Sequence, residues 1–157
     1  MQGFGPMVLR LAVGTVFVAH GAQKLFGIWG GGGPSGTAAF FNQLGLAPAY
    51  PLAILVGLVE LTGGALLIAG AFTMIASAVL TAVMLVAVWK VHLPWGFFLN
   101  WTNDPGQGHG YEFNLVLIAA LTALMLTGGG SISVDAQRLR TSESLAAGRA
   151  RLRSGGV

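Results

Sequence analysis

Four apolar segments of nearly bilayer length constrain this chain more than any other feature of its sequence. They cover about residues 7–26, 51–71, 73–93 and 111–127. A helix needs about 20 mainly apolar residues to cross the hydrocarbon core of a membrane. The pattern therefore predicts an all-α fold, an integral membrane four-helix bundle.

The composition agrees with a membrane protein. Charged residues make up 8% of the chain and apolar residues 54%, and the mean hydropathy is +0.74. A soluble domain carries about 25% charged residues, so this chain has too little polar surface to cover a water-soluble body. It has no cysteine, which excludes disulfide frameworks, thiolate nucleophiles and cysteine-ligated iron–sulfur or zinc sites.

The connections between the apolar segments differ in length. Only residues 70–72 separate the second segment from the third, which predicts a tight hairpin turn, whereas residues 27–50 and 94–110 form two longer loops. The second half of the first loop contains "SGTAAFFNQLGL", which could form a short interfacial helix. The second is rich in aromatic residues, which settle at membrane interfaces. We expect one transmembrane domain over residues 1–130 and a polar, basic tail over residues 131–157.

The basic residues indicate the orientation of the chain. Five of the eight follow Gly130, namely Arg138, Arg140, Arg149, Arg151 and Arg153. Such a cluster suits nucleic acid or anionic lipid, and beside a membrane helix we favour a topology signal over nucleic acid. The tail is then expected in the cytoplasm, the N-terminus also, and the two long loops outside. Arg10 agrees with this orientation, whereas Lys24 and Lys90 oppose it.

Polar residues within the spans gather toward the outer end of the predicted bundle. They are His20 and Lys24 in the first span, Lys90 and His92 in the third, and Glu112 and Asn114 at the start of the fourth. An ionisable group inside a span is costly and usually faces the bundle interior or a cavity. His20 and Lys24 are four residues apart and share a helix face, and Arg10 lies on nearly the same face. We expect this polar stripe to look inward.

Glu60 is the residue that is hardest to explain as a surface group. It lies nine residues into the second span, about 13 Å along the helix axis and near the middle of a core about 30 Å thick. It therefore needs a partner, such as His20, Lys24 or Arg10, or it is protonated. Small residues around it would let a neighbouring helix approach closely. They are Gly57, Gly63, Gly64 and Ala65.

Several of these polar residues also have plainer interpretations. Lys24, Lys90 and His92 suit the ends of spans, from which long polar side chains reach the headgroups. Glu112 suits the dipole at a helix N-terminus. Arg10 suits a lipid-phosphate anchor or a structural ion pair.

The chemistry-bearing residues exclude several classes of site. There is no hydrolase triad and no phosphate-binding motif, and Asp104 and His109 are typical of turn and loop residues. His20, His92 and Glu60 are too scattered to indicate a metal site. Two histidines on different helices could hold a haem axially, but we expect no built-in cofactor. A pocket for a lipophilic molecule with a polar head remains, and a quinone fits it, because its carbonyls accept from His or Lys and its reduction takes up protons.

The same stretches carry a resemblance to a known family. "LRLAVGTVFVAHGAQKLFG", "LGLAPAYPLAILVGLVELTGGALLIAG", "VHLPWGFF" and "GYEFNLVLIAALTALMLTGGG" together cover about residues 8–130. In this order they resemble the DoxX family of small bacterial four-helix membrane proteins. The resemblance implies a link to oxidoreductase systems, since relatives include a subunit of thiosulfate:quinone oxidoreductase. By motif, Arg10, His20, Lys24 and Glu60 carry over, and His92 and Glu112 match less closely.

These observations lead to a functional hypothesis. The chain is expected in the bacterial cytoplasmic (inner) membrane, binding a quinone in the outer half of the bundle. Glu60 and His20 would handle protons, and the polar head would contact Lys24, Arg10, His92, Glu112 and Asn114. Electrons would need a redox partner protein or a soluble reductant, and a homo-oligomer is compatible. The alternatives are a non-enzymatic anchor or assembly subunit of a redox complex, and a small-solute or proton conduit.

Overall fold

The regular structure of this protein is helical throughout the residues described. The computed structural model describes residues 4–154, and no strand occurs among them. The α-helices are α1 (Phe4–Phe26), α2 (Gly33–Gln43), α3 (Ala49–Ala69), α4 (Thr73–Ala87), α5 (Glu112–Thr127) and α6 (Val134–Ser154). A π-helical turn, η1 (Val88–His92), and a 3-10 turn, η2 (Leu93–Trp95), continue α4. The all-α prediction is confirmed.

Three helical segments are long and apolar enough to cross a membrane. They are α1, α3 and the continuous run Thr73–Trp95, of 23, 21 and 23 residues. The fourth apolar helix, α5, has 16 residues, which makes it about 24 Å long against a hydrocarbon core of about 30 Å. The membrane assignment is supported by these helices, and a bundle of four full spans stays a prediction.

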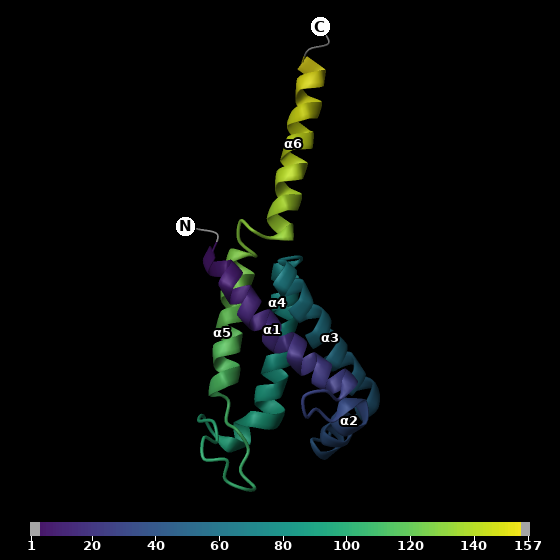
Figure 1. Ribbon diagram of the computed structural model, residues 1–157, viewed down its shortest axis with the longest axis vertical. Helices are drawn as coiled ribbons and strands as arrows, with labels where there is room; N and C mark the ends of the chain where they lie inside the picture. The colour runs from purple at the N-terminus through teal and green to yellow at the C-terminus, as the bar shows by residue number, and fades with distance from the viewer. Residues whose placement is uncertain (1–3, 155–157) are drawn as a thin grey trace.

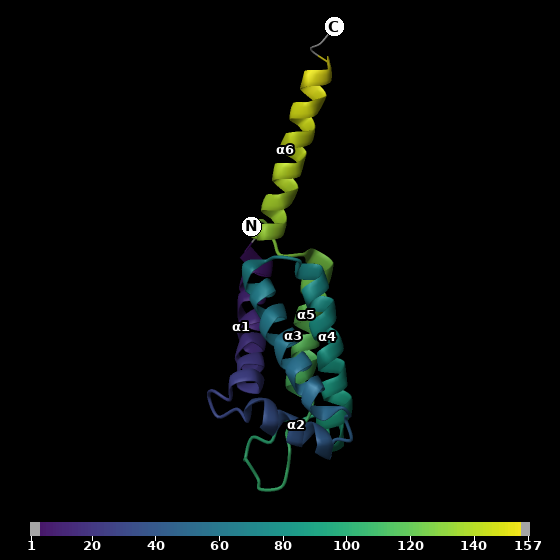
Figure 2. The same cartoon turned by 90° about the vertical axis from the view of Figure 1, so that its right-hand side faces the viewer.

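The packed helices α1, α3, α4 and α5 have two distinct ends. Figures 1 and 2 show α2 and the loop that precedes α5 at one end, and α6 projecting from the other, where α1 begins. We call these the α2 end and the α6 end. In Figure 1, α1 crosses the molecule obliquely and runs away from α5 toward the α2 end. The two helices therefore diverge at that end.

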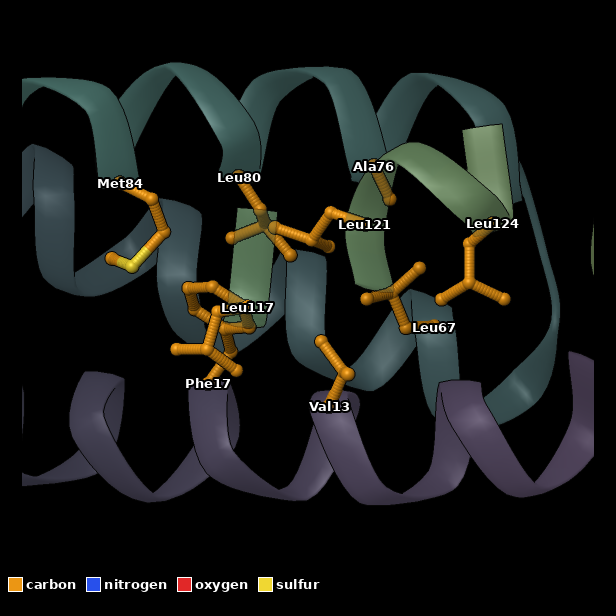
Figure 3. Close-up of a cluster of buried hydrophobic side chains, with 9 residues drawn as sticks. All are labelled: Val13, Phe17, Leu67, Ala76, Leu80, Met84, Leu117, Leu121 and Leu124. Carbon is orange, nitrogen blue, oxygen red and sulfur yellow. The ribbon is translucent and has the colours of Figure 1, made fainter. Parts of the chain in front are cut away.

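A hydrophobic core joins α1, α3, α4 and α5. Its buried members are Val13, Phe17, Leu67, Ala76, Leu80, Met84, Leu117, Leu121 and Leu124. Figure 3 shows these side chains converging from the four helices. Phe17 and Leu80 are essentially inaccessible, so the centre of the helix assembly is closed by packing rather than by polar contacts.

The predicted tight turn between α3 and α4 is present, and Gly70 makes it. Its φ is 67°, a left-handed conformation that costs glycine no steric strain. The Ala71 N–H donates to the Leu66 carbonyl at 2.9 Å, and the Gly70 N–H donates to the Leu67 carbonyl at 3.0 Å, which closes the end of α3. A Cβ at Gly70 would lie 2.5 Å from the Cβ of Ser133, so glycine also leaves room for the chain that leads into α6.

The interfacial helix expected near residue 35 is α2. Pro34 stands in its first turn, where a missing N–H costs no helical hydrogen bond. Ala38 and Phe41 on one side of α2 are buried against Ala49 and Ala53 of α3. This contact holds α2 across the α2 end of the helix assembly.

The widening of α4 into the π turn η1 has a local cause. Pro94 has no N–H, and its ring clashes with the carbonyl of the residue four positions earlier, here Lys90. The helix therefore loosens over Val88–His92 and stops after Leu93–Trp95. Turns of this kind often lie at functional sites, and this one carries Lys90 and His92.

The tail forms a helix that the sequence analysis did not assign. Its residues include strong helix formers such as Ala, Arg, Leu and Glu, but they are too polar to enter a membrane. The Asp135 N–H donates to the Gly70 carbonyl at 2.9 Å. The Asp135 carboxylate accepts from Phe72 N at 2.8 Å and from Thr73 N and Oγ1, both at 2.9 Å. The start of α6 thereby caps the N-terminus of α4.

Candidate functional site

A seam of glycines brings α1 and α3 unusually close together. A Cβ at Gly14 would lie 2.7 Å from the Gly64 carbonyl oxygen, and one at Gly21 would lie 2.5 Å from the Leu61 nitrogen. A Cβ at Gly57 would lie 2.8 Å from Cγ of Leu25. Membrane helices approach this closely where small residues remove the side chains between them. The prediction that glycines around Glu60 admit a neighbouring helix agrees with this packing.

The seam places an ion pair between the two helices. Lys24 Nζ lies 2.6 Å from Glu60 Oε2. Glu60 is 3% exposed, whereas the Lys24 side chain is 23% exposed. A carboxylate this deeply buried is tolerable only with a partner, and Lys24 is the one of the three candidate partners that fills this role.

A cavity of about 890 Å³ opens beside this pair. Its walls come from α1, α2, α3, α4 with η1, and α5, toward the α2 end where α1 and α5 diverge. Most lining residues are apolar, including Phe17, Phe40, Leu55 and Val83. The volume lies in the range of small-molecule sites, which combine apolar walls with a few placed polar groups.

The polar groups of the cavity stand on two walls. His20, Lys24 and Glu60 belong to the wall made by α1 and α3. The other wall contributes Lys90 and His92 from η1, His109 from the loop and Asn114 from α5. The structure therefore brings together five predicted site residues: His20, Lys24, Glu60, His92 and Asn114.

Hydrogen bonds fix the histidines of the second wall. His92 Nδ1 lies 2.8 Å from the His109 carbonyl oxygen, which can only accept, so this nitrogen carries the proton. His109 Nδ1 accepts from Asn100 N at 3.1 Å, so His109 is neutral and carries its proton on Nε2. Asn114 is buried and donates to the Met84 sulfur at 3.6 Å.

Glu112 is placed differently from the other predicted site residues. It is not among the residues that line the cavity. Its Oε1 accepts from Leu99 N at 2.9 Å, and its own N–H donates to the Phe97 carbonyl at 2.9 Å. Glu112 therefore holds the loop against the start of α5, and it supports the second wall without lining the cavity.

Arg10 lies at the α6 end, away from the cavity. It is 5% exposed, and its guanidinium donates to the carbonyls of Leu67, Ile68 and Ile132. These contacts tie α1 to the end of α3 and to the segment before α6. Arg10 shares a helix face with Lys24, as expected, but it does not share the cavity.

Two further lining residues, Lys90 and His109, lie outside the predicted site. The sequence leaves Lys90 open between a headgroup contact and a functional role, and His109 is the exposed loop residue that the sequence predicts. The sequence carries no signal that brings His109 to the cavity, since its position depends on how the loop folds back: Gly110 N donates to the Phe98 carbonyl at 3.0 Å and Tyr111 N to that of Gly96 at 3.1 Å.

The arrangement suits proton exchange and polar recognition within an apolar space. Within residues 4–154, no group of three or more His, Asp or Glu side chains is placed to hold a metal ion. An ion pair beside a histidine can give up or accept a proton when a ligand changes its own charge.

Comparisons with known proteins agree with these features. A family model described as DoxX matches residues 5–93, which include all of α1 except Phe4, the Lys24–Glu60 pair and η1. A protein of Bacillus subtilis (strain 168) named "Putative oxidoreductase CatD" is 29% identical over 131 residues, covering 83% of this chain and 84% of that protein. No solved structure gives a significant match.

Proposed function

This chain belongs to the DoxX family, and we propose that it is a membrane protein of quinone-linked redox metabolism that binds a quinone in the cavity at its α2 end. It acts either as an oxidoreductase or as the quinone-binding subunit of one. The name of its Bacillus relative supports the redox assignment.

The observation that carries this proposal is the pairing of an apolar cavity with a buried ion pair. The cavity has about 890 Å³ of space and largely apolar walls, and the Lys24–Glu60 pair lies at its α1–α3 wall. A quinone ring packs on apolar side chains, while its carbonyl oxygens require donors. Lys24, Lys90 and the Nε2–H of His109 are donors of the required kind.

Each cavity residue has a role in this proposal. Lys24 orients one carbonyl oxygen of the ring and, with Glu60, presents a proton beside it. His20, one helical turn before Lys24, exchanges that proton with the surroundings of the cavity. Asn114 and His92 orient the other side of the ring from the second wall. Arg10 and Glu112 hold the helices that form the cavity.

The chemistry requires an external source of electrons. Reduction of a quinone to a quinol takes two electrons and two protons. Protons reach the two ring oxygens through the Lys24–Glu60 pair and His20, which take them up again from the surroundings of the cavity, and a redox partner protein or a soluble reductant supplies the electrons. The chain's own role is to bind the ring, exclude water and deliver protons at the carbonyl oxygens.

Binding of a short-chain quinone to purified protein tests the proposal. Saturable binding is expected for the wild type and weaker binding for Glu60→Gln and His20→Ala. Glu143→Gln, in the exposed part of α6, is the matched control and should bind as the wild type does. A folded wild type that does not bind the quinone would exclude this function.

A second candidate function is a non-enzymatic anchor for a redox complex, and α6 is the observation that favours it. Every residue from 137 to 149 is exposed, and α6 projects away from the packed helices (Figure 1). Under this function, removal of the chain from residue 137 onward, which leaves Asp135 in place, abolishes co-purification of a partner, while Glu60→Gln leaves it intact. Loss of turnover with an intact complex would instead support the quinone site.

A further inference from the structure

The charges that line the cavity do not balance. Glu60 is the only acidic residue among the lining residues, and Lys24 takes up its charge at 2.6 Å. Lys90 also lines the cavity, together with His20, His92 and His109. Even with all three histidines neutral, the residues that line the cavity include one more cation than acid, namely Lys90.

Lys90 has no acidic partner among residues 4–154. The one ion pair within 4.0 Å there joins Lys24 to Glu60. The Lys90 ammonium lies 4.2 Å from the centroid of the Trp89 ring, and the carbonyls at the end of η1 add a partial negative charge. The carbonyls are dipoles and the Trp89 ring is a quadrupole. Neither cancels the full positive charge of the Lys90 ammonium beside an apolar cavity.

The acidic residues of the neighbouring loop and helix do not line the cavity. Glu112, at the start of α5, accepts from Leu99 N through Oε1, and Asp104, in the loop, accepts from Thr102 Oγ1 at 2.7 Å. Neither is among the lining residues, so Lys90 remains available to a negatively charged ligand.

His92 adds a second polar group to the same wall of the cavity. Because its Nδ1 carries a proton toward the His109 carbonyl, its Nε2 holds a lone pair when the ring is neutral. No other hydrogen bond of this ring is found in the described part of the chain. A polar group of a ligand can donate a hydrogen bond to that nitrogen.

We propose that the cavity selects acidic ring compounds, such as hydroxylated quinones whose ionised ring oxygen pairs with Lys90, over neutral quinones of the same size. The inference rests on the proposed function and names its substrate class. The acidic ring hydroxyl releases its proton to water before binding, and the resulting oxyanion pairs with the Lys90 ammonium. No electron is transferred in this step.

A matched pair of ligands tests the selection. 2-Hydroxy-1,4-naphthoquinone is an anion at neutral pH, and 2-methyl-1,4-naphthoquinone has nearly the same size and no charge. Binding of each to the purified full-length protein in nanodiscs of neutral lipid is measured by equilibrium dialysis. We expect the wild type to bind the hydroxylated compound about tenfold more tightly, the effect of one charge-assisted hydrogen bond.

Variants at Lys90 test whether its positive charge causes the preference. Lys90→Gln should lose the preference, so that the two ligands bind within about twofold of each other, while affinity for the methyl compound is kept. Lys90→Arg should retain the preference. Arg149→Gln, an exposed cation on α6, should behave as the wild type.

The outcomes distinguish the two proposals. Equal binding of both ligands by the wild type, or a preference that persists in Lys90→Gln, overturns the inference and leaves the quinone site standing. Failure of both ligands to bind overturns the proposed function as well. Decanoate tests whether a fatty-acid carboxylate provides the same chemistry, and tighter binding of decanoate than of the hydroxylated quinone would overturn the assignment to a ring compound.

Discussion

Lys24 and Glu60 face each other across two helices that touch through glycine backbone. Each residue alone would leave a charge beside apolar side chains, and the desolvation cost of one such ion is several kcal/mol. The 2.6 Å contact between Nζ and Oε2 offsets that cost. Removing one partner alone should therefore lower the free energy of unfolding more than replacing both partners by apolar residues.

A double-mutant cycle tests this coupling. Lys24→Met alone should lower the free energy of unfolding by about 3 kcal/mol, because Glu60 is left buried without its partner. Lys24→Met combined with Glu60→Leu should recover most of that loss and should still fail to bind a quinone. Unfolding by denaturing detergent measures the stability of each variant. If the loss in the double variant equals the sum of the losses in Lys24→Met and in Glu60→Leu, each made alone, the two residues are not coupled.

Asp135 gives the α6 end a dependence on pH. Its partial burial would raise the pKa, but hydrogen bonds from Thr73 and Phe72 and the charge of Arg138 outweigh this, so the pKa of Asp135 lies below its usual value. A carboxyl group with a lowered folded-state pKa stabilises the fold above its unfolded pKa. That contribution is lost as the pH falls through the folded pKa.

Hydrogen exchange along α6 tests this dependence. The first turn of α6 should be protected at pH values above the ordinary aspartate pKa of about 3.9 and lose protection in stronger acid. Asp135→Asn should reduce protection in the neutral range and flatten the pH profile. Glu143→Gln removes an exposed carboxylate of the same helix and should leave the profile unchanged. A wild-type profile that does not respond to acid would contradict this role.

At the scale of elements, the contact between α1 and α3 governs the geometry of the cavity wall. Gly21→Ala would put a Cβ 2.5 Å from the Leu61 nitrogen, so the helices must move apart. We expect a loss of about 2 kcal/mol in unfolding free energy, together with weaker quinone binding, because Lys24 and Glu60 separate. Gly5→Ala is the control on the same helix, since a Cβ there meets nothing within 4 Å. Equal stability of Gly21→Ala and Gly5→Ala would contradict the close packing of α1 against α3 at Gly21.

The elements were predictable where a local rule decides them. The turn at Gly70 follows from glycine's conformational freedom, and the three long apolar helices follow from hydropathy. Pro94 is a local reason for the helix to end, but it does not specify that the preceding turn widens into a π turn. The cap that Asp135 places on α4 depends on a contact between residues 62 positions apart, which no short stretch of sequence shows.

The candidate site was predictable to a similar degree. Spacing on one helix and depth in the span pointed to His20, Lys24 and Glu60. Arg10 lies on the same helix face as Lys24 but 14 residues before it, which is about 21 Å along the helix axis. A shared face therefore did not bring Arg10 to the cavity. His109 reaches the cavity through loop hydrogen bonds between backbone groups, which have no sequence signature.

At the scale of the whole molecule, the cysteine-free sequence allows a direct test of orientation. The basic tail predicts that α6 lies in the cytoplasm and the loop before α5 outside. Gln107→Cys, in that loop, should react with a membrane-impermeant maleimide in intact cells. Ser142→Cys, in α6, should react only after the membrane is opened. Both positions are exposed, so the reverse pattern would show that the chain is inserted the other way round.

The Lys24–Glu60 contact also sets an order for biogenesis. The two residues are 36 positions apart, so Lys24 is synthesised, and enters the membrane, before its partner carboxylate. Until α3 arrives, the Lys24 ammonium has to stay near the membrane surface, where a long side chain can reach water. The final depth of α1 is therefore fixed only once α3 has entered beside it, which makes the α1–α3 pair, rather than the single helix, the unit of membrane insertion.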